Sequence, residues 1–105
     1  MYQIQFYVPH SHLETVKAAL FAAGAGQVGN YSHCCWQTKG EGQFLPSESS
    51  LPYTGSKYQI NTIDEYKVEM VCQAHVLKQA IQALCSHHPY ETPAYSIIKI
   101  DTPND

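Results

Sequence analysis

The feature that most constrains this 105-residue chain is a pattern that occurs twice: a strand, then a helix, then a polar segment. Residues 2–8 alternate apolar and polar side chains, which predicts a half-buried strand, and residues 11–23 carry apolar side chains at helical spacing. Residues 65–72 and 74–87 repeat the two patterns in the same order. Each helix must cover a sheet with its apolar side, so the repeat predicts two βα units packed on one core.

Two further strands complete the predicted sheet, one from Tyr31 to Thr38 and one from Ala94 to Ile100. The order is then β-α-β-β-α-β, the split βαβ arrangement of the ferredoxin-like class. This is an α+β fold, with an antiparallel sheet and two helices on one face. We expect residues 1–105 to form a single domain with a polar tail at 101–105. A long polar loop is expected at about 39–64, and such a loop is functional, disordered or a hairpin extension with poorly legible strands.

Charge and hydropathy exclude several partners. The net charge is −3 and all six basic residues are Lys, so the chain has no Arg for bidentate phosphate or guanine contacts. We therefore expect no nucleic-acid partner. No segment approaches the roughly 18 apolar residues of a membrane span, and Met1 leads directly into a strand pattern instead of a signal peptide. We expect no membrane contact, a cytoplasmic location and reduced cysteines.

A polar joint follows each predicted helix. The first joint covers residues 24–35 and the second joint covers residues 87–95. The candidate metal ligands in these joints are His33, Cys34, His87, His88 and Glu91. Nitrogen, sulfur and oxygen donors of this kind suit Zn²⁺ or Cu²⁺, so they form a candidate site if the fold brings the joints together. The alternative for the two adjacent imidazoles is capping, because the C-terminus of a helix favours a cation.

The glycines of the first joint match a dinucleotide fingerprint, Gly24-x-Gly26-x-x-Gly29, but they follow a helix, whereas the fingerprint opens one. We interpret them as a helix cap, with Gly24 in the left-handed conformation, and a backbone nest for a small anion is the alternative. No catalytic residues are predicted. Cys34 and His33 are adjacent, and adjacent residues on a strand point to opposite faces.

Four ordered motifs carry a resemblance to a known family: G-A-G-Q-V-G-N-Y-S-H-C-C-W, G-E-G-Q-F-L-P, L-P-Y-T-G and H-P-Y-E-T-P-A-Y. Over residues 1 to 100 the chain resembles the PII/CutA-like domain inserted in the dinuclear-metal "GTP cyclohydrolase 1 type 2 homologue" proteins, also called NGG-interacting-factor-like proteins, here standing alone. The resemblance implies a domain that trimerises, with the loop after the second strand projecting toward partners or ligands. It implies no catalysis for this piece.

The expected function is that of a small cytoplasmic PII/CutA-like module. It forms a homo-oligomer, with a trimer favoured, and binds a small ligand or a divalent metal, Zn or Cu, in a regulatory role. Self-association is expected because one sheet face stays uncovered, with Tyr7, Tyr31 and Val71 as candidates to lie there. The loop at 39–64 is a candidate contact for a protein partner. The alternatives are an accessory chain that completes a metal-dependent hydrolase site on a partner, or a purely structural assembly module.

Overall fold

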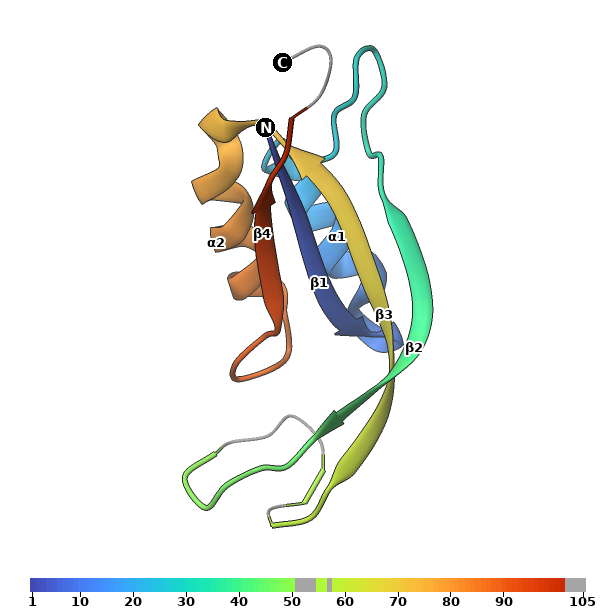
Figure 1. Cartoon of the computed structure of the whole chain (residues 1–105), viewed down its shortest axis with the longest axis vertical. Helices are drawn as coiled ribbons and strands as arrows, with labels where there is room; N and C mark the ends of the chain where they lie inside the picture. The colour runs from blue at the N-terminus through green and yellow to red at the C-terminus, as the bar shows by residue number, and fades with distance from the viewer. Residues whose placement is uncertain (51–54, 57, 102–105) are drawn as a thin grey trace.

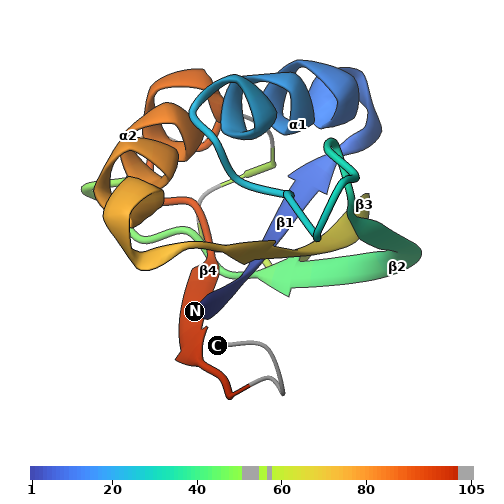
Figure 2. The same cartoon turned by 90° about the horizontal axis from the view of Figure 1, so that it is seen from above.

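The computed structural model describes residues 1–50, 55–56 and 58–101, and its strands and helices form two layers. In chain order the elements are β1 (Tyr2–Pro9), α1 (Leu13–Ala22), β2 (Trp36–Phe44), β3 (Asn61–Cys72), α2 (Leu77–His87) and β4 (Tyr95–Lys99), with a short 3-10 helix before each α-helix. The sheet order is β2-β3-β1-β4 and all neighbouring strands are antiparallel. Both helices cover the same face (Figure 1 and Figure 2), which confirms the predicted α+β fold.

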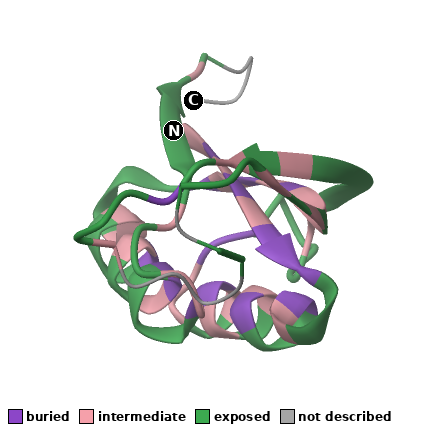
Figure 3. Cartoon of the chain, turned by 90° about the horizontal axis from the view of Figure 1, so that it is seen from below, coloured by how far each residue is buried: buried purple, intermediate pink, exposed green. Residues whose placement is uncertain are grey.

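The core lies between the helices and the two central strands. The alternation predicted from the sequence is present in both central strands, because the inward-facing residues of β1 and β3 are buried. These residues are Ile4, Phe6, Val8, Val68, Met70 and Cys72. Val16 and Leu20 of α1 and Ala80 and Leu84 of α2 close the other side. Figure 3 shows that buried residues concentrate on β1 and the helix sides facing it, while the edge strands β2 and β4 are exposed.

Helix α1 is followed by a capping glycine, Gly24, as predicted. The N–H of Gly24 donates to the carbonyl of Phe21 at 3.0 Å, and the N–H of Ala25 donates to the carbonyl of Leu20 at 3.1 Å. This is the Schellman pair of bonds, and it requires a left-handed residue after the helix. Gly24 meets that requirement with φ +105°. Gly24 therefore acts as the predicted helix cap, whereas Gly26 bonds to Val71 of β3.

Strand β2 lies later in the chain than predicted. It covers Trp36–Phe44 instead of Tyr31 to Thr38, and Tyr31 forms an isolated antiparallel bridge with Val28 within the first joint. Apolar alternation could not locate this strand, because β2 is an edge strand and most of its residues are exposed. The expectation that Tyr31 lies on the uncovered sheet face was therefore wrong.

Part of the long loop predicted at 39–64 forms a hairpin extension, which was one of the alternatives left open by the sequence. Strands β2 and β3 stay paired as far as Phe44 opposite Asn61, so the connection between them shortens to residues 45–60. The pattern was not recognised because no residue of this extension is buried: half-buried residues such as Phe44 and Ile63 alternate with exposed ones, which gives only a weak apolar alternation.

The paired extension, residues 40–44 and 61–65, is called the arm below. It projects beyond the helices (Figure 1), and the molecule is 47 Å long against 24 and 23 Å in the other directions. Residues 51–54 and 57 of the predicted loop, and 102–105 of the predicted tail, lie outside the described residues. No helix in the described part of the chain is long and apolar enough to cross a bilayer.

Candidate functional site

The two joints lie at opposite ends of the sheet. In the first joint, Gly26 donates its N–H to Val71, which pairs with Gln3 near the start of β1. In the second joint, Ala94 accepts a hydrogen bond from the N–H of Tyr7 at 3.3 Å. Four residues along a strand correspond to about 13 Å. Because β1 and β3 are antiparallel, the two βα units run in opposite directions. The single chain therefore does not bring the two joints together, which was the condition for a metal site shared between them within one copy.

The candidate ligands of the first joint are engaged in local contacts. His33 adopts φ +60°, its Nδ1 lies 3.1 Å from the hydroxyl of Ser32, and its ring centroid lies 4.9 Å from that of Phe21. Cys34 donates its backbone N–H to Gly26 at 2.8 Å and its thiol to the carbonyl of Ser32 at 3.7 Å. All four cysteines are free thiols. These contacts stabilise the conformation of the joint.

His88 is buried and connects the second joint to β1. Its Nε2 lies 2.6 Å from the carbonyl oxygen of Tyr7, and its Nδ1 lies 3.1 Å from the N–H of Tyr90. A carbonyl only accepts and an N–H only donates, so the ring is neutral and carries its proton on Nε2. Burial lowers the pKa of His88 below its ordinary value of 6.5, against the opposing effect of the bond to Tyr7. With both nitrogens engaged, His88 has no lone pair for a metal.

The remaining candidates of the second joint are exposed. His87 donates from Nδ1 to the carbonyl of Ala83 at 2.9 Å, one turn earlier in α2, which agrees with the capping alternative. Glu91 lies in the turn before β4. No group of three or more His, Cys, Asp or Glu side chains within the described ranges is placed to hold a metal ion. Metal binding by these residues therefore stays a prediction.

Tyr90 joins the second joint to the arm. Its hydroxyl donates to Oε2 of Glu65 at 3.0 Å, and its ring meets the ring of His88 edge-on at a centroid distance of 4.6 Å. The Glu65 side chain lies across Gly42 of the neighbouring strand, where a Cβ atom would collide with the carboxylate. The absence of a side chain at Gly42 thus allows Glu65 to reach Tyr90.

These contacts border a cavity of about 270 Å³ between the second joint and the arm. Tyr7, Phe44 and Ile63 contribute apolar walls, and Glu65, Tyr90 and Glu91 contribute polar groups. Of these residues the sequence predicted only Glu91 as a candidate. Glu65 lies 25 positions before its partner Tyr90, and only the strand register, which alternation does not give, would have revealed it.

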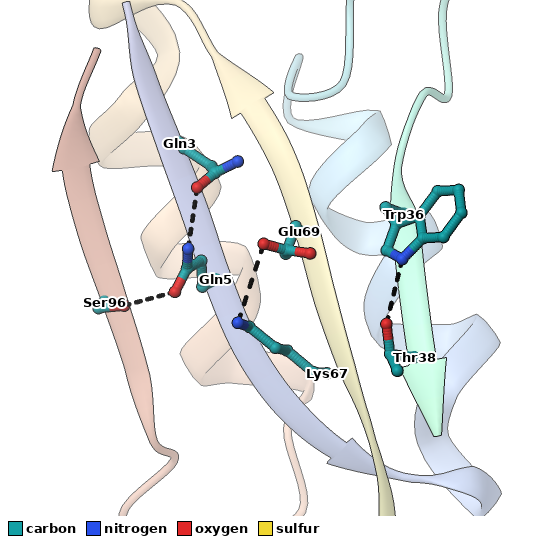
Figure 4. Close-up of polar contacts among 7 residues, drawn as sticks. All are labelled: Gln3, Gln5, Trp36, Thr38, Lys67, Glu69 and Ser96. Atoms are coloured by element: carbon teal, nitrogen blue, oxygen red, sulfur yellow. Dashed lines mark hydrogen bonds and ion pairs between the residues drawn. The ribbon is translucent and has the colours of Figure 1, made fainter. Parts of the chain in front are cut away.

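The uncovered face of the sheet is mainly polar. Figure 4 shows the polar contacts on this face. Gln5 donates to Gln3 at 2.9 Å and accepts a bond from Ser96 at 3.4 Å. Trp36 donates to Thr38 at 3.1 Å, and Lys67 forms an ion pair with Glu69 at 3.9 Å. Trp36 is 68% exposed at one side of this face. Hydrogen bonds and an ion pair between its own side chains therefore satisfy much of the polar surface of this face.

The fold is that of a PII/CutA-like domain. The structure of the PII-like protein CutA from Nostoc sp. PCC 7120 matches with a TM-score of 0.70 at 15% identity, covering 100% of this chain and 86% of that chain. CutA1 from Pyrococcus horikoshii matches with a TM-score of 0.72 at 15% identity, covering 100% of this chain and 88% of that chain. At this identity the likeness shows the fold alone.

Sequence similarity points to particular relatives. The GTP cyclohydrolase 1 type 2 homolog of Mycobacterium leprae (strain TN) is 42% identical over 97 residues, which are 92% of this chain and 25% of the relative. That of Bacillus subtilis (strain 168) is 37% identical over 99 residues, or 94% of this chain and 26% of the relative. A Bacillus cereus protein related to NIF3 matches with a TM-score of 0.83 at 35% identity, covering 96% of this chain and 26% of that chain.

No family model matches the chain. The chain spans about a quarter of the length of the curated relatives it matches. It is a PII/CutA-like domain similar to one segment of the GTP cyclohydrolase 1 type 2 homologs, which confirms the resemblance seen in the four motifs.

Proposed function

We propose that this chain is a cytoplasmic, homo-oligomeric PII/CutA-like module that binds a small ligand in a regulatory role and catalyses no reaction of its own. The observation that carries the proposal is the cavity between the second joint and the arm. Its walls come from three segments far apart in the sequence, β1, the arm and the second joint, and side-chain bonds hold these segments together. A ligand there would contact all three and could alter the position of the arm.

The edges of the sheet support self-association. Strand β4 is an edge strand that exposes Tyr95, Ile97 and Ile98 by 40%, 39% and 43%, and an apolar edge of this kind is a site for pairing with another chain. The opposite edge, β2, is polar apart from Trp36 at its start and Phe44 at its end. Contact between two different edges is heterologous, and it forms a closed ring when its rotation closes and a filament when it does not. We propose a closed ring of three copies.

Sedimentation equilibrium at micromolar concentration tests the trimer. We expect a mass near three times the 11.8 kDa of the chain. Ile98→Lys places a charge on the apolar edge and should give monomers, whereas Val28→Lys, at a residue 51% exposed in the first joint, should leave the trimer intact. A wild-type monomer would contradict the proposal and favour the accessory-chain alternative. A native mass spectrum of the same sample would report any retained ligand.

The connection between β2 and β3 is the surface we propose for a protein partner. Leu45, Tyr58 and Ile60 are 62%, 67% and 67% exposed there, at the end of an arm that projects away from the core. Apolar side chains gathered at a projecting tip are typical of contact surfaces. A divalent metal remains the other proposed ligand, and because the joints lie apart in one chain, a site shared between them would require two copies.

A further inference from the structure

We propose that the cavity at the second joint binds a small organic cation, a protonated amine on a compact apolar body, with Glu65 as its counter-ion. This names the ligand class for the binding function proposed above and rests on that function.

The charge of the cavity favours a cation. Among the described residues that line it, Glu65 and Glu91 carry carboxylates, and none is Lys or His. Lys67, two positions along β3 on the same face, forms an ion pair with Glu69 at 3.9 Å. A phosphate or carboxylate ligand would therefore meet negative charge without a basic partner, and burying such a group unpaired is strongly unfavourable.

The Glu65 carboxylate is held in place before any ligand arrives. Tyr90 donates its hydroxyl to Oε2 at 3.0 Å, and the absence of a side chain at Gly42 leaves room for the carboxylate to lie against the neighbouring strand. Two carboxylate oxygens offer about four acceptor sites, so one bond from Tyr90 leaves capacity for an ammonium group. A fixed acceptor binds more tightly because little freedom is lost when the ligand arrives.

The apolar walls define the rest of the ligand. Tyr7 and Phe44 present aromatic rings, and Ile63 adds an aliphatic surface. A ring face attracts a cation within about 6 Å, and an apolar body gains by leaving water. The volume of about 270 Å³ lies below the usual range for drug-sized ligands, so the ligand should be small, with one ring or a short branched chain.

The test uses three probes with the same phenyl ring: 2-phenylethylammonium, neutral 2-phenylethanol and anionic 3-phenylpropionate. Each is titrated at pH 7 into the full ¹⁵N-labelled chain, and the amide shifts of Gly42, Glu65 and Ala94 give the dissociation constant. We expect saturable binding of the ammonium probe. Glu65→Gln, which removes the charge and keeps the shape, should weaken binding about tenfold or more, as expected for a hydrogen bond to a charged group.

Asp64→Asn is the matched control. It removes the same charge from the adjacent residue of β3, whose exposed side chain points to the opposite face, and it should change binding by less than about twofold. Tyr90→Phe is a second variant that keeps the ring and removes the bond to Glu65, so it should weaken binding several-fold. The amide spectra of all variants report whether the fold is retained.

The outcomes separate the two proposals. If 2-phenylethanol or 3-phenylpropionate binds as tightly as the ammonium probe, the cation proposal is wrong while the cavity remains a ligand site. If Glu65→Gln and Asp64→Asn weaken binding equally, the effect is general charge and the assignment of Glu65 is wrong. If no probe binds at millimolar concentration, the cation proposal and the cavity as ligand site fail together.

Discussion

The two joints occupy equivalent places in the two βα halves, but different interactions close them. In the first joint, backbone hydrogen bonds hold the chain in place. Gly24 and Gly26 have positive φ, and the backbone of Gly26 bonds to Val71 and to Cys34. In the second joint, the side chains of His88 and Tyr90 reach β1 and the arm. A joint closed by its backbone leaves its side chains at the surface, whereas a joint closed by side chains buries polar groups and supplies the walls of a cavity.

Of the variants that test this contrast between the joints, His88→Ala should cause the largest loss of unfolding free energy. The substitution leaves the carbonyl of Tyr7 and the N–H of Tyr90 without their partner in a buried place, which should cost about 2–4 kcal/mol of unfolding free energy. Urea denaturation measures it. His33→Ala in the first joint and His87→Ala at the helix end, both exposed, should each cost less than about 1 kcal/mol. Equal losses at His88 and His33 would contradict the contrast.

The first joint should instead be sensitive at its backbone. In Gly26→Ala the new Cβ would lie 2.7 Å from Cε1 of Phe21 and 3.0 Å from the carbonyl oxygen of Cys34, at φ +80°. We expect a loss of about 2–3 kcal/mol from strain and crowding. Gly29→Ala is the control, since it shares a positive φ of +56° but meets nothing within 4 Å, and it should cost about 1 kcal/mol. The same denaturation assay would refute the interpretation if both variants lost equal stability.

The second joint should also make stability depend on pH. Burial lowers the pKa of His88, so below about pH 6.5 the unfolded chain binds a proton at this ring that the folded chain resists. Stability then falls as the pH decreases from 6.5 toward the folded-state pKa, with a slope of at most about 1.4 kcal/mol per pH unit for one proton. A protonated Nδ1 can no longer accept the N–H of Tyr90, and the nearby His12 opposes the charge further.

Comparing wild type with His88→Gln isolates this effect from the other titrating groups. The difference in unfolding free energy between the two proteins should narrow between pH 7.5 and pH 5.5, because only the wild type loses the contribution of the neutral ring. A difference that stays constant over this range would show that His88 does not titrate differently in the folded state.

The sequence predicted well those elements that bury only one face. Phe6 and Met70 are buried and alternate with half-buried neighbours, because one face of their strands meets the core. Gly24 follows α1 because a left-handed residue completes that cap. Strand β2 was misplaced for the same reason, since an edge strand exposed on both faces carries no alternation. Apolar alternation therefore indicates which strands are buried on one face, but it does not locate a strand that is exposed on both faces.

The side-chain contacts of the second joint could not be predicted from the sequence. His88 bonds to a residue 81 positions away and Tyr90 to one 25 positions away, so no local spacing marks either contact. The motif H-P-Y-E-T-P-A-Y correctly drew attention to the segment. It suggested ligation by His88, although the fold uses both nitrogens of that ring to hold the segment against β1.

The smallest expected effect is on metal uptake. It tests the prediction that donors from both joints form one metal site. If copies of the chain bring the joints together, removing the donors of either joint should abolish the shared site, because each joint supplies part of the ligand set. Zn²⁺ and Cu²⁺ titrations, followed by calorimetry, would compare wild type, His33→Ala/Cys34→Ala and His87→Ala/Glu91→Ala. His88→Gln is the control and should leave uptake unchanged, since Tyr7 and Tyr90 already occupy its ring nitrogens. If only one of the two double variants loses metal uptake, the metal binds at that joint alone. Equal uptake by all four proteins would contradict the metal prediction and would show that the two joints are functionally separate.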